Sequence, residues 1–229
     1  MPVFKLVAFD LDGTLVDSVP DIAWAVDQMS RTLGLSPPGL EKVSSWVGDG
    51  VRRLVKRALT GSRDGEPEAE LFERGFETFR QAYHGHLAVA TRPYPDACDV
   101  LAQLRDSGIA LACITNKAAE FTEPLLDALA MRDYFGVILS GDSLAARKPD
   151  PLPLLHAARQ FGVAPAQSCM VGDSRNDVLA ARAAGFAAIG VRYGYGGELL
   201  ADSVPDAVLD SLAALPALLA NWPAGLVQA

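Results

Sequence analysis

Two carboxylates stand directly after an apolar run near the start of the chain. Residues 3–9 are apolar except for Lys5, which predicts a buried strand, and the run ends in Asp10, Asp12 and Gly13. A buried strand that ends in acids is expected to face a cleft, and in open α/β sheets the cleft lies beyond the carboxyl ends of the strands. Asp10 is therefore a candidate nucleophile or metal ligand, and Asp12 is a candidate acid/base partner.

Polar residues follow later apolar runs in the same way. These residues are Thr115 and Asn116 after the run 109–114, Lys148 in the loop beyond 135–139, and Asp173 after 168–171, with Asp177 one helical turn further on. Parallel strands place their carboxyl ends at one sheet edge, so we expect these side chains to converge. Each has a plainer interpretation when taken alone: Thr115 as a helix cap, Lys148 as a surface lysine, and Asp177 as a helix-start acid.

The elements that must position these residues alternate between strand and helix patterns. Strands are predicted at 3–9, 109–114, 135–139, 168–171, 187–191 and 207–209, and helices at 20–33, 40–46, 51–59, 67–86, 96–107, 118–129, 152–161, 177–184 and 212–219. Residues 90–95 contain two prolines and are typical of a linker. The sequence predicts an α/β fold with a doubly wound parallel (Rossmann-like) sheet core of residues 1–17 and 91–229, and an inserted all-helical cap domain of residues 18–90.

The composition narrows the classes of partner. The chain has 229 residues, 50% of them hydrophobic, and a net charge of −8, which argues against nucleic acid as a partner. Three widely spaced cysteines imply no disulfide or zinc framework, and the three histidines do not share a helix face. No apolar stretch is long enough to span a membrane, and the first strand begins almost at Met1, which leaves no room for a signal peptide. We expect a cytoplasmic protein, either a monomer or a homodimer.

The order of the polar motifs resembles that of the haloacid dehalogenase-like hydrolases. The four motifs are Asp10–Thr14, Thr115, Lys148 and Gly172–Asp177, in that order along the chain. The resemblance implies phosphoryl transfer with Asp10 as nucleophile and Asp12 as acid and later base. It also implies Mg²⁺ between Asp10 and Asp173, with the Asp12 carbonyl as a further ligand. By the same resemblance, Asp177 would assist this metal site, Thr115 and Asn116 would hold phosphoryl oxygens, and Lys148 would bind Asp10 and the phosphoryl group.

By the same resemblance, dehalogenases of this family lack an acid at the position of Asp12. The acid in this chain therefore favours phosphatase activity.

The predicted cap contains a second resemblance. Residues 46–55, with Gly48, Gly50 and Arg52, look like the cap loop and helix of phosphoglycolate phosphatases. Two glycines before a helix expose amides that suit a carboxylate, and Arg52 adds positive charge. A plain turn between two helices with a solvated basic face is the alternative for this segment.

The leading hypothesis is a Mg²⁺-dependent phosphatase that hydrolyses a small phosphate monoester. The favoured substrate is 2-phosphoglycolate, which the enzyme would cleave to glycolate and phosphate. An alternative is a phosphatase or phosphomutase acting on sugar phosphates or amino-sugar phosphates. A second alternative, from another class, is a phosphate-binding module without catalytic activity. The intact set of Asp10, Asp12, Thr115, Lys148 and Asp173 argues against the last of these.

Overall fold

Six parallel strands form the central sheet, in the spatial order β5-β4-β1-β6-β7-β8. A computed structural model describes residues 4–222, apart from the side chains of residues 198, 199 and 201. The strands are β1 (Leu6–Phe9), β4 (Ala110–Ile114), β5 (Val137–Leu139), β6 (Ser168–Gly172), β7 (Ala187–Val191) and β8 (Ala207–Leu209). Because β1 lies in the middle and later strands add outward on both sides, the sheet is doubly wound. The predicted fold class is confirmed; Val3 of the predicted first strand lies outside the described residues.

Side chains of β1 alternate between two apolar clusters, one on each face of the sheet. Val7 and Phe9 belong to one cluster, and Leu6 and Ala8 to the other. This follows from strand geometry, since successive side chains point to opposite faces. The strand is therefore buried on both sides, and its carboxyl end is fixed rigidly at the centre of the sheet.

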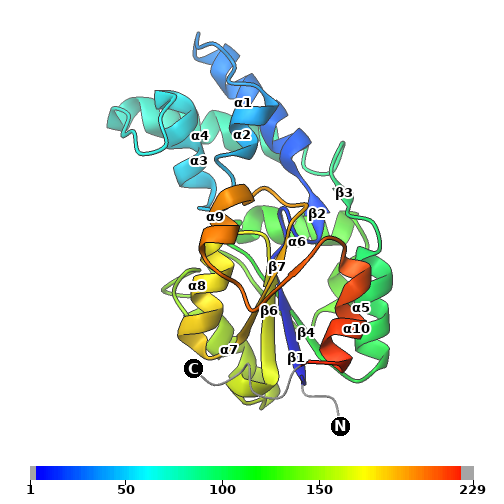
Figure 1. Ribbon diagram of the computed structural model, residues 1–229. Helices are drawn as coiled ribbons and strands as arrows, with labels where there is room; N and C mark the ends of the chain where they lie inside the picture. Colours follow the sequence, from blue (N-terminus) through cyan, green and yellow to red (C-terminus); the bar gives the residue numbers. More distant parts are fainter. Residues whose placement is uncertain (1–3, 223–229) are drawn as a thin grey trace.

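Helices cover both faces (Figure 1). One face carries α5 (Ala97–Asp106), α6 (Ala119–Ala128) and α10 (Leu215–Ala220), and the other carries α7 (Leu152–Phe161), α8 (Arg175–Ala184) and α9 (Gly197–Asp202). Short 3-10 turns occur at Arg132–Tyr134, Pro165–Gln167 and Leu212–Ala214. The sequence pattern did not predict α9, because the preceding glycines are typical of a loop.

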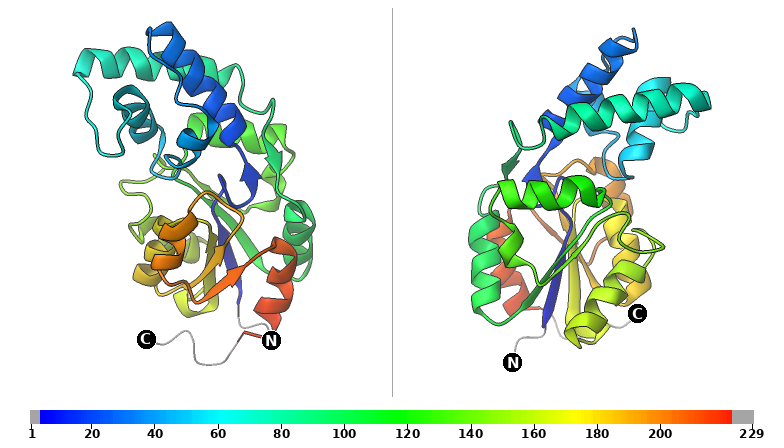
Figure 2. Two further views of the ribbon diagram at one scale, coloured as in Figure 1. Left: turned by 45° about the horizontal axis from the view of Figure 1, so that its top comes forward. Right: turned by 180° about the vertical axis from the view of Figure 1, so that it is seen from behind.

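Four helices between β1 and β4 lie together beyond the carboxyl edge of the sheet (Figures 1 and 2). They are α1 (Val19–Thr32), α2 (Leu40–Ser44), α3 (Val51–Thr60) and α4 (Ala69–His84). Each carries buried apolar residues on one side; in α4 these include Phe72, Phe79 and Tyr83. We refer to this helical unit, residues 18–90, as the cap.

Two segments of the chain connect the cap to the core domain. They pair as short antiparallel strands, β2 (Val16–Asp17) and β3 (Arg92–Pro93). The sequence predicts a linker at residues 90–95, where β3 lies, and no strand at residues 16–17. The fully buried carboxylate of Asp21 reinforces this joint, because it accepts hydrogen bonds from the amides of Ala90 and Thr91 and from the Thr91 hydroxyl. The joint sets the direction in which the cap leaves the sheet.

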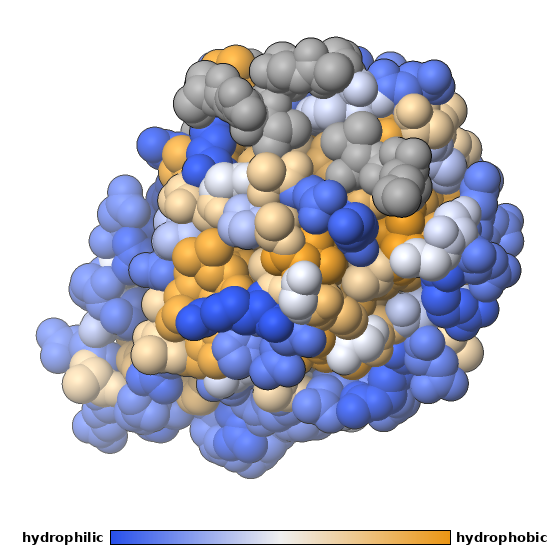
Figure 3. Space-filling model, turned by 90° about the horizontal axis from the view of Figure 1, so that it is seen from below, coloured by the Kyte–Doolittle hydropathy of each residue, from blue (hydrophilic) through white to orange (hydrophobic). Residues whose placement is uncertain are grey.

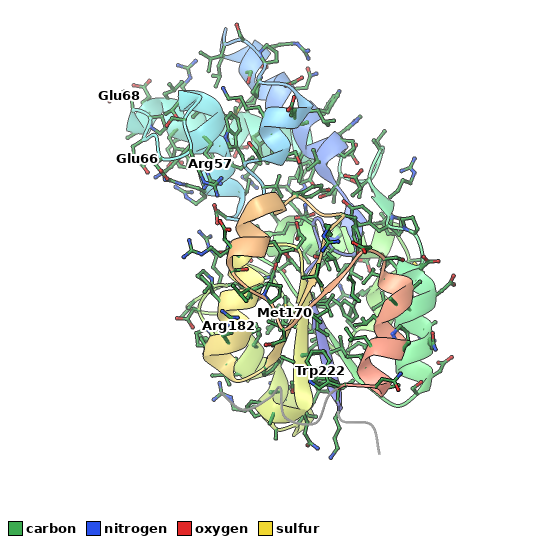
Figure 4. All side chains as sticks on the ribbon, in the orientation of Figure 1. Arg57, Glu66, Glu68, Met170, Arg182 and Trp222 are labelled. Carbon is green, nitrogen blue, oxygen red and sulfur yellow. The ribbon has the colours of Figure 1, made fainter. Side chains whose placement is uncertain are left out.

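The opposite face of the molecule has a different character. Figure 3, seen from below, shows apolar residues gathered in its middle with hydrophilic residues around them, and grey atoms cover part of it. Phe4 and Trp222 close the core at this end, with ring centroids 5.1 Å apart in an edge-on arrangement; Trp222 is labelled in Figure 4. Among the described residues, no helix is both long and apolar enough to cross a membrane.

Candidate active site

The carboxyl edge of the sheet, below the cap, collects buried polar side chains from several strands. They are Asp10, Thr115, Asn116, Lys148, Asp173 and Asp177, each at most 7% exposed. Burying so many polar groups costs free energy unless they pair with one another or bind a ligand. Such a cluster is typical of a functional site.

Lys148 lies at the centre of this cluster. Its Nζ is 3.0 Å from Asp10 Oδ1 and 2.6 Å from Asp177 Oδ1, and it donates a hydrogen bond to the carbonyl of Ile114. Burial alone would lower the pKa of Lys148, but the carboxylates of Asp10 and Asp177 raise it above its ordinary value. The lysine is therefore a buried cation directed at the first acid, and the surface-lysine interpretation is wrong.

Three carboxylates lie close enough to share one cation. Asp10, Asp173 and Asp177 each offer an oxygen within 4.8 Å of the others. Burial raises the pKa of Asp10 to about 7, against the opposing effect of Lys148. Burial, together with the charges of Asp10 and Asp177, raises the pKa of Asp173 to about 8. Lys148 thus does not compensate all the negative charge, and this set of hard oxygen donors fits a divalent cation such as Mg²⁺.

Backbone geometry lets Asp173 approach Asp10. Gly13 has φ +86, and a Cβ there would collide with the Asp173 carboxylate, so the turn after β1 requires glycine at this position. The carboxylate accepts hydrogen bonds from the Thr14 hydroxyl at 3.2 Å and from the Tyr195 amide at 2.7 Å. The turn that ends β1 therefore also fixes the acid from β6.

Asp177 plays two parts at once. Its Oδ2 accepts hydrogen bonds from the amide and the hydroxyl of Ser174, which forms the capping box at the start of α8. Its Oδ1 pairs with Lys148. The helix-start interpretation is thus confirmed, and the same residue positions the central lysine. Asp177 therefore starts α8 and orients Lys148, and it also lies within reach of an ion shared with Asp10 and Asp173.

Asp12 faces the cap, away from the acidic cluster. Its Oδ1 accepts a hydrogen bond from Ser18 Oγ at 2.6 Å, and Lys117 Nζ lies 3.1 Å and 3.2 Å from its two oxygens. The same Nζ donates to the hydroxyl of Tyr83, in α4 of the cap, at 2.7 Å. Asp12 therefore stands between the nucleophile candidate and the cap, where a leaving group would depart.

Thr115 and Asn116 occupy the end of β4. Thr115 lines the cavity beside Asp10, and its hydroxyl accepts a hydrogen bond from the Lys117 amide at 3.2 Å. It is not the N-cap of α6, which is Ala118. The Asn116 amide group donates to the carbonyls of Gly48 and Lys148, so this core residue also holds the cap loop.

A cavity opens between the cap and the sheet edge. Its lining includes Asp10, Asp12, Thr115, Gly48 and Gly50. The predicted glycines therefore do face the acid pair.

Arg52 does not reach this cavity. Its guanidinium lies over the rings of Phe72 and Phe76, 3.4 Å from Glu73, and its side chain is 56% exposed. A helix turns by about 100° per residue, so the residue after Val51 points to another side. The expectation that Arg52 contacts the substrate is thus not supported by its position.

The sequence patterns did not point to three residues that the fold brings to the site or to the cap loop beside it: Lys117, Asn176 and Arg57. Lys117 follows Thr115 by two residues, and that place in a strand-end loop is the signal that was available. Asn176 donates to Gly48 and Asp49 of the cap loop, and Arg57 of α3 pairs with Asp49 at 2.5 Å. Figure 4 labels Arg57 at the edge of the cap that faces the core.

Known proteins resemble this chain over most of its length. The family model for haloacid dehalogenase-like hydrolases matches residues 4–185. A phosphoglycolate phosphatase of Nitrosococcus oceani is 46% identical over 218 residues, 95% of this chain and 97% of that protein. One from Neisseria meningitidis is 50% identical over 212 residues, 91% of this chain and 90% of that protein. The crystal structure of a predicted phosphoglycolate phosphatase from Haemophilus somnus has a TM-score of 0.90 at 35% identity and covers 95% of this chain and 99% of that one.

The motif resemblance, the sheet order and these matches agree over nearly the whole chain. The family model alone spans residues 4–185, which include Asp10, Thr115, Lys148 and Asp173. The chain therefore belongs to the haloacid dehalogenase-like hydrolase family.

Proposed function

We propose that this chain is a Mg²⁺-dependent phosphatase that hydrolyses 2-phosphoglycolate to glycolate and phosphate through an aspartyl-phosphate intermediate. One observation carries the proposal. The Asp10 carboxylate at the end of β1 lies 3.0 Å from a buried lysine, borders two further acids, and faces a cavity that Asp12 also lines. That arrangement suits nucleophilic attack on an anionic ester.

In the first step, an Asp10 oxygen attacks phosphorus and the ester P–O bond breaks. Lys148 offsets negative charge on the attacking group and on the phosphoryl oxygens. The Thr115 hydroxyl and the backbone amide of Asn116 stand at the neighbouring strand end, where they can donate hydrogen bonds to those oxygens. Asp12 gives its proton to the departing alkoxide, which leaves as glycolate.

In the second step, water hydrolyses the phosphate on Asp10. Asp12, now ionised, takes a proton from that water, and phosphate and the free Asp10 carboxylate are released. Ser18 and Lys117 hold the Asp12 carboxylate in place between the steps.

The acids of β1 and β6 would hold the metal ion. Asp10 and Asp173 would supply carboxylate oxygens, the Asp12 carbonyl a further one, and Asp177 would keep Lys148 and the edge of the site in place. A bound Mg²⁺ ion supplies positive charge that lets the dianionic phosphoryl group approach a carboxylate.

The choice of substrate is supported by the relatives and by the cap. The curated relatives that are 46–50% identical carry the name phosphoglycolate phosphatase. A cap of residues 18–90 closing on a core of residues 1–17 and 91–229 suits a small ester, because closure excludes water. We further infer a cytoplasmic enzyme acting on a free metabolite. Its negative net charge disfavours nucleic acid, and its three cysteines are free thiols.

A panel of phosphate esters with Mg²⁺ tests the proposal. We expect 2-phosphoglycolate to be the best substrate, activity to stop in excess chelator, and Mg²⁺ to restore it. A preference for sugar phosphates would point to another substrate class within the family. Absence of turnover on every ester, including a generic aryl phosphate, would mean a phosphate-binding module. Full activity in excess chelator would remove the metal from the mechanism.

A further inference from the structure

The proposed substrate carries a carboxylate at the end that bears no phosphate, and a cation in the cavity would stabilise this second negative charge. Lys148 lies behind Asp10 and is occupied by two carboxylates, and Arg52 lies outside the cavity. Among the described residues that line the cavity, Lys117 is the one cation. Its side chain is only 5% exposed, so its charge acts on the cavity with little screening by water.

Lys117 connects the acid site with the cap. Its Nζ contacts Asp12 from the core side and the Tyr83 hydroxyl from the cap side, and it stands 4.8 Å from the centre of the Tyr83 ring. An ammonium group has three N–H donors, and here they face the two Asp12 oxygens and the Tyr83 hydroxyl. A substrate carboxylate would therefore take the donor that one of the two Asp12 oxygens accepts. Since Tyr83 accepts a hydrogen bond from Lys117, its own hydrogen is free to donate to a ligand.

The position also fits the geometry of a small ester. Asp12 is the group placed to protonate the ester oxygen, and Lys117 Nζ lies 3.1 Å from Asp12 Oδ1. In 2-phosphoglycolate the carboxylate is one methylene beyond the ester oxygen. If the phosphoryl group is bound next to Asp10 and the rest of the substrate extends toward Asp12, the substrate carboxylate lies beside Lys117 and Tyr83.

We propose that Lys117 binds the carboxylate of the substrate, with Tyr83 as a second donor, and so selects esters that carry a carboxylate next to the phosphate. The inference rests on the proposed phosphatase function and goes beyond it by naming the residue that determines specificity. The rival role is a positioning one, in which Lys117 only orients Asp12 and serves every substrate equally.

The test compares 2-phosphoglycolate with its primary amide, which has the same ester linkage but no negative charge at the far end. In Lys117→Met, kcat/KM for 2-phosphoglycolate should fall about 10- to 100-fold, the scale of a lost charge-assisted hydrogen bond, with much of the loss in KM. The amide, which would lose only the contribution of Lys117 to the orientation of Asp12, should lose at least about tenfold less than 2-phosphoglycolate. Arg52→Met is the matched control, because it removes an exposed cation beside the cavity, and it should leave both substrates unchanged.

Two results would overturn the inference. Equal losses on both esters, confined to kcat, would mean that Lys117 acts only through Asp12. An unchanged preference for the carboxylate in Lys117→Met would place the carboxylate elsewhere. Wild-type protein that hydrolyses other esters but not 2-phosphoglycolate would instead overturn the proposed function, so the two failures are distinguishable.

A measurement on the wild-type protein covers the case in which Lys117→Met does not fold. Glycolate should inhibit turnover of an aryl phosphate competitively, while neutral glycolamide should inhibit at least about tenfold less. Equal inhibition by both compounds would show that the cavity holds no cation for a carboxylate, and would contradict the assignment of Lys117.

Discussion

Asp10 is oriented from two sides before any substrate arrives. Its Oδ1 accepts a hydrogen bond from the Leu11 amide at 2.7 Å and pairs with Lys148. Asn at this position keeps the shape but loses the nucleophile, so Asp10→Asn should lower kcat by more than about 10³-fold. Phosphate release measures turnover, and circular dichroism with thermal unfolding checks the fold. Turnover close to that of the wild type would remove Asp10 as the nucleophile.

Asp12 is tested through the leaving group. Asp12→Asn can still accept hydrogen bonds from Ser18 and Lys117 but cannot donate a carboxylic proton. An alkoxide such as that of glycolate needs the proton, whereas nitrophenolate leaves without one. We expect a loss of about 10²–10⁴-fold on 2-phosphoglycolate and a much smaller one on nitrophenyl phosphate. Steady-state kinetics on both esters measure this, and the same loss on both would show that Asp12 is not the acid of the first step.

Proton binding and ion binding compete at the acidic cluster. In the metal-free protein, burial raises the pKa of Asp10 to about 7 and that of Asp173 to about 8. Below these values the carboxyls hold protons that a cation must displace, so the apparent Mg²⁺ affinity should rise as pH increases from about 6 to about 9. The rise in melting temperature on adding Mg²⁺ measures it. Asp173→Asn should weaken both the Mg²⁺ effect and its pH dependence, and an Mg²⁺ effect that grows as pH falls would contradict the assignment.

At the scale of elements, the apolar runs predict most of the sheet because its four central strands, β1, β4, β6 and β7, are buried on both faces. The polar residues at strand ends follow, since topology brings Asp10, Thr115 and Asp173 to one edge. The strands β2 and β3 were not predicted, because two residues each are too short for any periodicity. Lys117 also escaped prediction: its partners, Asp12 and Tyr83, lie 105 and 34 residues away, and only the packing of the cap on the sheet brings the three together.

Within the cap, Arg57 holds the loop that faces the core. Its side chain is 4% exposed; it pairs with Asp49 and donates to the carbonyls of Trp46 and Arg63. Arg57→Met would leave these groups without their partner, and we expect a loss of about 2–4 kcal/mol in the free energy of unfolding. Urea denaturation measures it.

Arg53 on the same helix supplies the control. It pairs with Asp64 and Glu66 at the surface, where solvent screens the charges. Arg53→Met should therefore destabilise far less than Arg57→Met. Equal losses from the two variants would mean that the buried pair contributes no more than a surface one.

At the scale of the whole molecule, the cap is tied to the core at separate places. The Asp21 carboxylate holds the joint at residues 90–91, and Arg80 of α4 pairs with Glu120 of α6 at 3.0 Å. On the other side of the cavity, two core asparagines, Asn116 and Asn176, both donate to the Gly48 carbonyl. A rotation of the cap about the joint would break the bonds of the two asparagines to Gly48, whereas the bonds of Asp21 lie at the joint itself. These asparagines are therefore expected to set how much of the population is closed.

Asn176 tests this without touching the reacting groups. It is half-buried, and its amide group reaches the Gly48 carbonyl at 3.3 Å and Asp49 Oδ1 at 2.9 Å. Asn176→Ala removes both bonds, so kcat/KM for 2-phosphoglycolate should fall about 3- to 10-fold, which corresponds to about 0.7–1.4 kcal/mol. Amide hydrogen exchange over residues 46–50 should become faster, because the loop opens more often. Asn221→Ala, which removes an exposed bond to Ala217 in α10, should change neither quantity. If the kinetics and the exchange of Asn176→Ala both match the wild type, the closed cap does not depend on this contact, and closure must be secured by Asn116 or by the α4–α6 ion pair.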